Sequence, residues 1–366
     1  MAIEDRLPAA GDATVRTRVA DGWRGMRVTA VLACLVAAVV VAVLASVGLG
    51  PVGVSPAEVL RVTAGELAPG LFDTAADPLS RQIVWDFRLP RALLGAVVGA
   101  GLALVGAVLQ ATVRNPLADP YVLGVSAGAS AGAVAALTLG LATSLGLSLA
   151  AFLGAAVATG AVYALARRGG RITPTRLVLA GVSLGYLFQA VYSYLLLTAD
   201  PRAAQSTLFW LLGSLGSADW ADLGIPAVVL VLGSVILLAQ ARSLNSLITG
   251  DETAVSLGLD VERFRLRMLL LTSLLVGVMV SVSGAIAFVG LVVPHAVRLV
   301  LGADHRRLLP ASALVGAAFL VLVDLAARTV AQPREVPLTI VTSLIGVPFF
   351  VWLLQRRGRD REGLAE

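Results

Sequence analysis

The sequence predicts an all-α, polytopic membrane protein with about ten transmembrane helices. Hydrophobic residues make up 58% of the 366 residues and charged residues only 14%. Soluble domains, in contrast, are about 45–50% apolar and about 25% charged. Residues 29–49 carry no charge, and at about 1.5 Å rise per residue a helix of this length covers one hydrocarbon core.

Apolar segments of similar length recur along the chain with polar turns between them. The predicted spans are residues 29–49, 91–113, 121–141, 145–166, 176–198, 223–241, 266–284, 286–302, 308–330 and 337–354. Between the first two spans, residues 50–90 are rich in proline and form the longest predicted external segment, with short helical turns.

Arginine placement predicts the orientation. An even number of spans puts both termini on one side, and with that side in the cytoplasm most arginines lie inside, as the positive-inside rule requires. The external ones are Arg61, Arg81, Arg88, Arg91, Arg202, Arg328 and Arg334. We therefore expect a cytoplasmic tail over 1–28, a transmembrane domain over 29–357 and a second cytoplasmic tail over 358–366.

Several classes of function are disfavoured. All 28 basic residues are arginines set between apolar runs, so no basic face suits nucleic acid. Cys34 is the single cysteine, and His295 and His305 are too few for a histidine-rich site, so we expect no metal ligands. A nucleotide-binding G-x-x-x-x-G-K-[ST] loop is impossible without lysine, and no catalytic cluster is evident. We expect no cofactor on this chain, and any ATP would be hydrolysed by another chain.

Small residues indicate close helix packing. Gly124, Gly128 and Gly132 recur every four residues, and Gly95 and Gly99 do so one span earlier. In lipid, such faces hold helices together, and we favour this interpretation over a direct ligand contact.

The chain also predicts an inverted internal repeat, as in many transporters. One register places Gly99, Gly106, Ala107, Pro116, Val122, Leu123 and Gly124 on Gly277, Gly284, Ala285, Pro294, Val300, Leu301 and Gly302.

The polar stretch 242–265 is long for an internal loop. Thr249 and Glu252 fit a capping box, and Gly258 fits a helix C-cap, which predicts a helix of about two turns between them. A helix this short is marginal alone in water. It is either a capped surface turn or a helix that docks on a partner.

Charges near the external ends of spans have two interpretations. Asp324 and Arg328 are four residues apart on one helical face, which predicts a structural ion pair. Arg88 and Arg91 flank Pro90 and either anchor the chain at the interface or attract an acidic partner. At the other side, the turn from Arg114 to Pro120 is either a simple connection or a constriction at the inner mouth.

Several long motifs in order resemble one known family. They are RLPRALLGAVVGAGLALVGAVLQATVRNPLADPYVLGVSAGASAG, TRLVLAGVSLG, FWLLGSLGSADW, LNSLITGDETAVSLGLDV, AFVGLVVPHAVRLVLGADHRRLLP and PLTIVTSLIGVPFFVWLL. Over about residues 85–357 the chain resembles the FecCD-like permeases of type II ABC importers, which carry ferric siderophores, haem or vitamin B12.

The resemblance implies a bacterial inner-membrane permease that pairs with a second permease subunit, most simply as a homodimer. Two ATP-binding subunits, which hold ATP and Mg²⁺, would bind on the cytoplasmic side, and an extracytoplasmic substrate-binding protein would dock outside. The cargo would be a metal chelate, with ferric siderophore first, haem second and cobalamin as the alternative.

The resemblance also assigns roles to residues. Those expected to contact the ATPase are Thr249, Gly250, Asp251, Glu252, Thr253, Ala254, Ser256, Leu257 and Gly258. Arg88, Arg91 and Arg328 would receive acidic residues of the binding protein. Asn115 and Leu117 would form an inner gate, and Thr173 and Thr175 a second one, with Pro174 standing where the family's vitamin B12 importer has a small hydroxyl residue.

The implied mechanism is alternating access through a largely apolar channel. The rival class is an ion-coupled secondary transporter, for which Asp324 is the one candidate relay. An intramembrane enzyme is a third class, without a plausible catalytic cluster.

Overall fold

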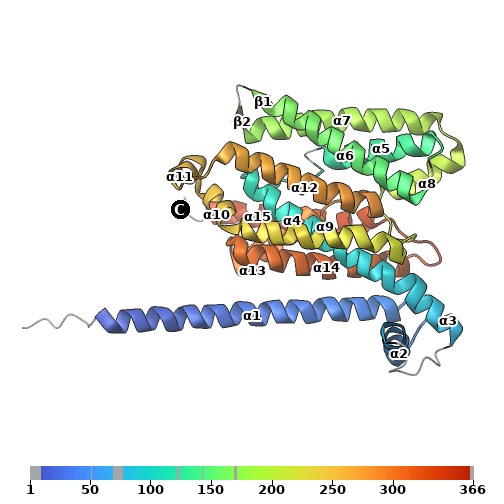
Figure 1. Ribbon diagram of the computed structural model, residues 1–366, viewed down its shortest axis with the longest axis horizontal. Coiled ribbons are helices and arrows are strands. Elements are labelled where there is room, and N and C mark those ends of the chain that lie inside the picture. Colours follow the sequence, from blue (N-terminus) through green and yellow to red (C-terminus); the bar gives the residue numbers. More distant parts are fainter. Residues whose placement is uncertain are drawn as a thin grey trace, which may run out of the picture.

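The computed structural model describes residues 10–50, 52–68, 77–121, 124–141, 143–168 and 171–362, and there the chain is almost entirely helical (Figure 1). The predicted tails fall partly outside it, at residues 1–9 and 363–366. The helices are α1 (Ala10–Gly48), α2 (Pro56–Leu67), α3 (Pro78–Arg81), the π-helix η1 (Gln82–Arg88), α4 (Leu89–Thr112), α5 (Val125–Thr138), α6 (Ser144–Ala166), α7 (Pro174–Thr198), α8 (Pro201–Leu211), α9 (Trp220–Ala239), α10 (Ala241–Thr249), α11 (Asp251–Ser256), α12 (Val261–Ser283), α13 (Val289–Leu301), α14 (His305–Thr329) and α15 (Leu338–Glu362).

The all-α fold is confirmed, and a helix lies over each of the ten predicted spans. Seven helices of the described chain are long and apolar enough to cross a membrane, whereas α5, α13 and the apolar part of α15 are shorter. The exception to helix is a two-residue antiparallel pairing of β1 (Arg167–Arg168) with β2 (Arg171–Ile172), which turns the chain from α6 into α7.

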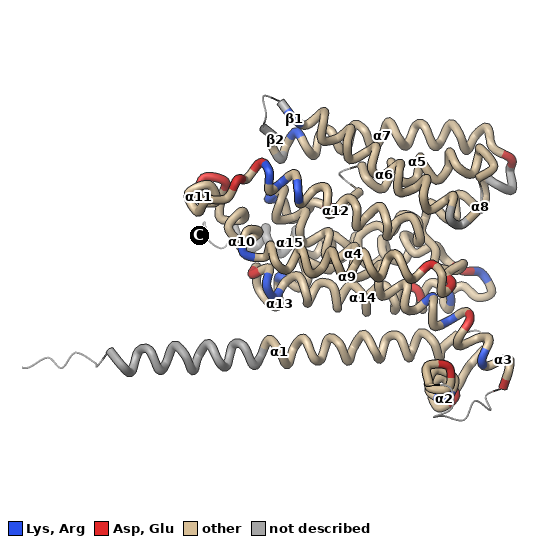
Figure 2. The backbone as a smooth tube through the Cα atoms, viewed as in Figure 1, with Lys and Arg blue, Asp and Glu red and all other residues tan. Residues whose placement is uncertain are grey.

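Charged residues gather at the two ends of the bundle and leave its middle uncharged, as a membrane protein requires (Figure 2). One end carries α2, α3 and α8, and the opposite end carries α10, α11 and the start of α12 (Figure 1). After the orientation that the sequence predicts, we name them the external end and the cytoplasmic end. At the first end Trp220 stacks on Trp85 with ring centroids 4.7 Å apart, and its indole Nε1 donates to the Trp85 carbonyl. Paired tryptophans are typical of a membrane–water interface.

Helix α4 forms the centre of the bundle. In the helical stretch from Pro78 to Thr112, 83% of the apolar window is buried, against 6% in α1 and 17% in α7. A helix apolar all round is expected in such a central place. The side chains that α1, α7 and α9 expose are largely apolar and suit contact with lipid or with another subunit.

Glycines allow the backbones around α4 and α5 to touch. A Cβ at Gly106 would lie 1.8 Å from the Gly290 carbonyl oxygen of α13, and one at Gly99 would lie 2.2 Å from that of Gly316 in α14. Gly128 and Gly132 contact α6 in the same way, which confirms the predicted packing role. Gly124 differs, because it caps α5 with a φ of +72° instead of lying within the helix.

The predicted repeat is visible in element order rather than in the matched residues. The long–short–long–long order of α4 to α7 recurs in α12 to α15, and α4 and α12 run in opposite directions (Figure 1). The residue pairing was wrong, since Pro116 lies in a turn whereas Pro294 lies inside α13. Val122 and Leu123 lie outside the described residues.

The chain between α12 and α13 is not helical, and its backbone finds partners on neighbouring segments. Gly284 caps the end of α12 and Phe288 caps the start of α13, with φ values of +67° and +68°. The Thr339 hydroxyl donates to the Ala285 carbonyl over 2.8 Å, and the Ser214 N–H donates to the Ser283 carbonyl over 2.9 Å. Irregular backbone inside a membrane requires such partners.

Candidate functional site

The predicted coupling region forms two short helices on the cytoplasmic end. Helix α10 is amphipathic: Ala241, Leu244 and Leu247 are buried against the bundle, while Ile248 and Thr249 are exposed. Helix α11 has six residues, of which Ala254 is fully buried. Glu252, Val255 and Leu257 are exposed, so this end presents both charged and apolar side chains to its surroundings.

The predicted capping box of Thr249 and Glu252 is wrong. Thr249 is the last residue of α10, and its hydroxyl donates to the Ser246 carbonyl over 2.7 Å, within its own helix. The N-cap of α11 is Gly250, without a side-chain cap. Its φ of +129° is a conformation that favours glycine, and this lets the chain reverse between the two helices.

The predicted C-cap at Gly258 is confirmed. Gly258 has a φ of +84°, its N–H donates to the Val255 carbonyl, and the Leu259 N–H donates to the Ala254 carbonyl. This pair of bonds is a Schellman motif. The short helix therefore has a defined end, and Leu257 projects beside it with 67% of its surface exposed.

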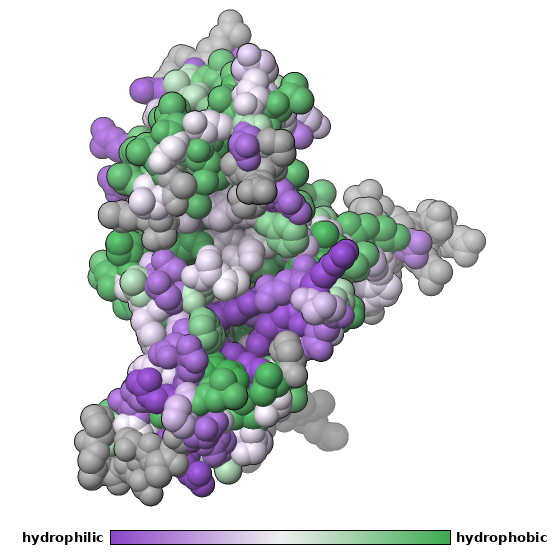
Figure 3. Space-filling view, turned by 90° about the vertical axis from the view of Figure 1, so that its right-hand side faces the viewer, coloured by the Kyte–Doolittle hydropathy of each residue, from purple (hydrophilic) through white to green (hydrophobic). Residues whose placement is uncertain are grey.

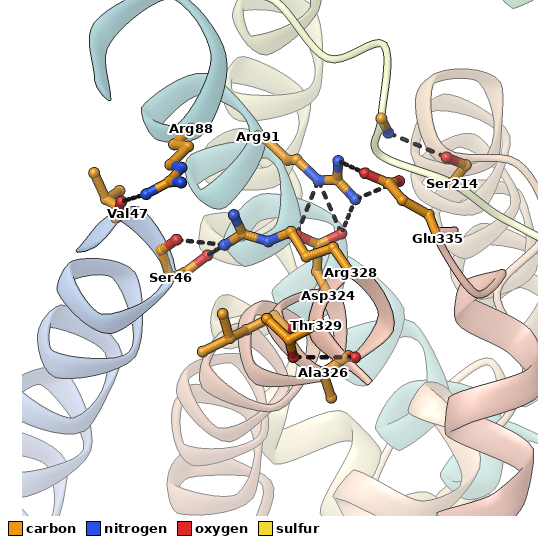
Figure 4. A network of polar contacts seen from close by, with 12 residues as sticks. Ser46, Val47, Arg88, Arg91, Ser214, Asp324, Ala326, Arg328, Thr329 and Glu335 are labelled. Atoms are coloured by element: carbon orange, nitrogen blue, oxygen red, sulfur yellow. Dashed lines mark hydrogen bonds and ion pairs between the residues drawn. The ribbon is translucent and has the colours of Figure 1, made fainter. Parts of the chain in front are cut away.

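The three predicted docking arginines lie at the external end, where the structure ties them into the chain itself (Figure 4). Arg91 donates to both oxygens of Asp324 over 2.9–3.1 Å, and to both oxygens of Glu335 over 2.8 and 3.0 Å. Arg328 lies 3.5 Å from Asp324, which confirms the predicted ion pair, and it donates to the backbone and hydroxyl oxygens of Ser46.

The side chain of Arg88 binds backbone carbonyl groups rather than a carboxylate. Its guanidinium donates to the carbonyls of Val47, Gly48 and Val52, over 2.8, 3.3 and 2.5 Å. Arg88 and Arg328 are each 7% exposed, so neither side chain is presented to the outside. They fasten the external end of α1 to η1 and α14.

Glu335 is the member of this cluster that reaches the surface, with 44% of its side chain exposed. The hydrogen bonds from Arg91 lower the pKa of Glu335, so it is ionised at neutral pH. On the face of the molecule at this end, hydrophilic side chains gather in the middle and lower part, with hydrophobic ones on the flanks (Figure 3).

The predicted inner-gate residues lie on a turn directly after α4. The Asn115 side chain accepts from the Leu117 N–H over 2.9 Å and so holds the turn closed, and Leu117 is 48% exposed. Close behind it, Asp119 is buried and accepts from the Tyr121 N–H. Burial raises the pKa of Asp119 to about 6.

The second predicted gate lies on a different element from the first. Thr173 and Thr175 are exposed at the start of α7, where Pro174 occupies the first helical position that proline favours. Among the described residues, no hydrogen bond or ion pair joins them to Asn115 or Leu117.

A cavity of about 530 Å³ opens among α5, α7 and α8. The polar members of its lining are Tyr121, Ser126, Ser130, Tyr186, Gln189 and Tyr192, and none of its lining residues is charged. No sequence pattern indicated this cavity, the buried carboxyl group of Asp119 or the exposed Glu335. Their partners lie on other elements, or are backbone atoms.

Comparison with known proteins identifies relatives over most of the chain. The model of the FecCD transport family matches residues 38–356. A cobalamin import system permease protein, BtuC, of Halobacterium salinarum is 46% identical over 77% of this chain and 75% of its own length. The hemin transport system permease protein HmuU of Yersinia pestis is 38% identical, covering 80% and 89% of the two chains.

Two further matches extend this picture. The Fe(3+)-citrate import system permease protein YfmD of Bacillus subtilis is 39% identical over 78% of this chain and 87% of its own. A solved structure of a protein assigned to the metal-chelate type of ABC transporter, in an inward-facing conformation, superposes with a TM-score of 0.79 at 34% identity. It covers 90% of this chain and 99% of its own.

Proposed function

Because this chain belongs to the FecCD transport family, we propose that it is the transmembrane permease subunit of an ABC importer that carries a metal chelate across the bacterial inner membrane. In this proposal both termini are cytoplasmic, and the chain works with a second copy of itself, two ATP-binding subunits and an extracytoplasmic binding protein. ATP and Mg²⁺ belong to the ATP-binding subunits. This chain binds no cofactor and hydrolyses nothing.

The observation that carries the proposal is α11. It is a capped helix of six residues that buries Ala254 and exposes Glu252, Val255 and Leu257. Such a helix has little stability of its own and suits a complementary cleft on another protein. We assign the residues from Thr249 to Gly258 to the contact with the ATP-binding subunit.

At the external end, the network around Arg91 supports docking of an acidic partner. Arg91 would exchange Glu335, its half-exposed partner, for a carboxylate of the binding protein. Arg88 and Arg328, which are buried, would act by holding α1 and α14 in place below this contact.

The cargo path is assigned to the uncharged cavity beside α7, with Asn115, Leu117, Thr173 and Thr175 as gate residues at its cytoplasmic exit. Since no hydrogen bond or ion pair among the described residues joins the two threonines to Asn115 or Leu117, the second copy would complete the gate. A bare ion would need coordinating groups, whereas a bulky chelate fits a cavity lined by tyrosine, serine and glutamine.

Two cargo classes are supported by different relatives. An iron chelate, with ferric siderophore first and haem second, is our proposal, and relatives named for hemin and Fe(3+)-citrate support it. Cobalamin is the second candidate, favoured by the 46% identity to a permease named for cobalamin import. ATPase activity of the reconstituted complex, measured against a panel of ferric siderophores, haem and cobalamin, separates them.

Glu252→Arg tests the coupling assignment. Reversing this exposed charge should weaken association with the ATP-binding subunit and reduce cargo uptake into proteoliposomes. Unchanged association and uptake would show that α11 is not the coupling site. Uptake that persists in vesicles without ATP or an ATP-binding subunit would instead favour an ion-coupled secondary transporter.

A further inference from the structure

A single buried arginine at the cytoplasmic end joins three segments of the chain. Arg265 lies in the second turn of α12, and 4% of its side chain is exposed. Its two terminal nitrogens donate to the two carboxylate oxygens of Asp251, over 2.8 and 3.0 Å. Its Nε donates to the carbonyl of Thr112 over 3.2 Å. The guanidinium therefore links the first residue of α11 to the last residue of α4.

Both acceptors are suited to a guanidinium. The carbonyls in the last turn of a helix have no intrahelical partner and carry partial negative charge, and Thr112 ends α4. Asp251 supplies a full charge in a bidentate geometry. The rigid fork of arginine can bind both at once, whereas the point charge of lysine cannot reproduce this arrangement.

The segment that Arg265 holds leads directly into the predicted inner gate. Arg114, two residues after Thr112, has a φ of +52° and lies 3.6 Å from Asp251. The Asn115 N–H donates to the Gln110 carbonyl, and the Asn115 side chain accepts from Leu117. A shift of the Thr112 carbonyl is thus passed on to the gate turn.

Helix α11 has few other attachments to the bundle. Ala254 is its buried side chain, and Asp251 itself is 42% exposed. The ionic link through Arg265 is therefore the main polar connection between the surface of α11 and the bundle interior in the described chain.

We infer that Arg265 is a positioning residue that passes movement of α11 to the inner-gate turn at Asn115 and Leu117. The inference rests on the proposed function, because it takes an ATP-binding subunit as the source of that movement. Arg265 contacts neither partner nor cargo. It couples the position of the Thr112 carbonyl to that of the Asp251 carboxylate.

The test reads the gate directly in the complete complex with the ATP-binding subunits and binding protein. Cys34→Ala removes the single cysteine, and Leu117→Cys then places one thiol on the exposed gate residue. Labelling by a membrane-impermeant maleimide is measured with and without ATP and vanadate. The variants are Arg265→Lys and Asp251→Asn, and the matched control is Arg267→Lys, an exposed arginine on the same helix.

We expect nucleotide to change the labelling rate in the parent and in Arg267→Lys. In Arg265→Lys and Asp251→Asn this change should shrink by about 2- to 30-fold. In Arg265→Lys, whose altered side chain is buried, the ATP-binding subunit should still copurify. Should Arg265→Lys fold poorly, Asp251→Asn breaks the same link from its exposed side, together with the contact between Asp251 and Arg114.

A nucleotide response in both variants equal to that of the control would overturn the role of Arg265. Loss of copurification in Asp251→Asn together with an unchanged response in Arg265→Lys would do the same. A parent complex that neither binds the ATP-binding subunit nor responds to nucleotide would overturn the proposed function, and this inference with it.

Discussion

The external and cytoplasmic ends of this protein both concentrate arginines and carboxylates, but they use them differently. At the external end, Asp324 is 1% exposed and lies between Arg91 and Arg328, so its charge serves contacts inside the chain. At the cytoplasmic end, Asp251 is 42% exposed although its partner Arg265 is 4% exposed. The carboxylate of Asp324 is thus enclosed by the chain, whereas that of Asp251 reaches the surface.

The difference in exposure between the two carboxylates determines how a substitution at each acts. A buried network resists change, because removing one charge leaves another without a partner in a low-dielectric setting. A half-exposed pair can be altered from outside at little cost to the fold. We therefore expect substitution of Asp324 to act on stability and substitution of Asp251 to act on coupling.

The largest effect is expected from Asp324→Asn. It leaves Arg91 and Arg328 without their shared buried carboxylate, and breaking a buried pair costs about 3–5 kcal/mol. Thermal unfolding in detergent, followed by tryptophan fluorescence, measures this. The control is Asp260→Asn, which removes an exposed pair with Arg263 and should change stability by no more than about 1 kcal/mol. Equal thermal unfolding midpoints for the two variants would contradict the stabilising role of the buried Asp324.

Gly258→Ala should have an intermediate, local effect. A Cβ at Gly258 meets no atom within 4 Å, so the cost is that of holding alanine at a φ of +84°, about 1–2 kcal/mol. Faster amide hydrogen exchange over α11 measures it. The control is Gly224→Ala in α9, where a Cβ also meets no atom within 4 Å but the backbone is helical. This change should not raise the rate of amide hydrogen exchange in α9. Similar exchange in both variants would contradict the capping argument.

Glu335→Gln should have a smaller effect that depends on pH. Arg91 lowers the pKa of Glu335 in the folded chain, so the ion pair adds stability above the unfolded pKa, and that stability is lost as pH falls through the folded value. The variant should be less stable than the parent by about 1 kcal/mol or less at neutral pH. Melting curves of the two proteins should converge in acid, and a gap that widens on acidification would contradict the assignment.

The smallest effect on stability is expected from Leu257→Ser. Leu257 is 67% exposed, so its replacement should leave the unfolding midpoint unchanged while weakening copurification with the ATP-binding subunit. Leu270→Ser changes a leucine that is 55% exposed on α12 and serves as the control for association. A drop in the midpoint without loss of association would show that α11 belongs to the fold rather than to an interface.

Sequence patterns were sufficient wherever the cause of structure is local. Hydrophobic runs located the helices, and Gly258 marked the end of α11, because a positive φ is a property of one residue. The pair Asp324 and Arg328 followed from spacing along one helix. Thr249 shows the limit of such patterns. Its hydroxyl donates to a carbonyl of its own helix, α10, although the sequence motif is equally compatible with an N-cap of the following helix.

Long-range partners could not be read from the sequence. Arg91 and Asp324 are separated by 233 residues, and Arg265 and Thr112 by 153, so neither pairing leaves a periodic signal. Counting arginines predicted an orientation but treated Arg265 and Arg267 as equivalent. The structure separates them, since one is buried on two acceptors and the other is exposed.

The attachment of α1 has a consequence for the order of membrane insertion during synthesis. Its external end is held by Arg88, 41 residues from Val47, and by Arg328, 282 residues from Ser46. Helix α1 leaves the ribosome before α14, which carries its second anchor. Until α14 has been inserted, the external end of the nascent α1 is therefore held by Arg88 and by the packing of Val47 with residues of α2, η1 and α4, without the contacts between Ser46 and Arg328.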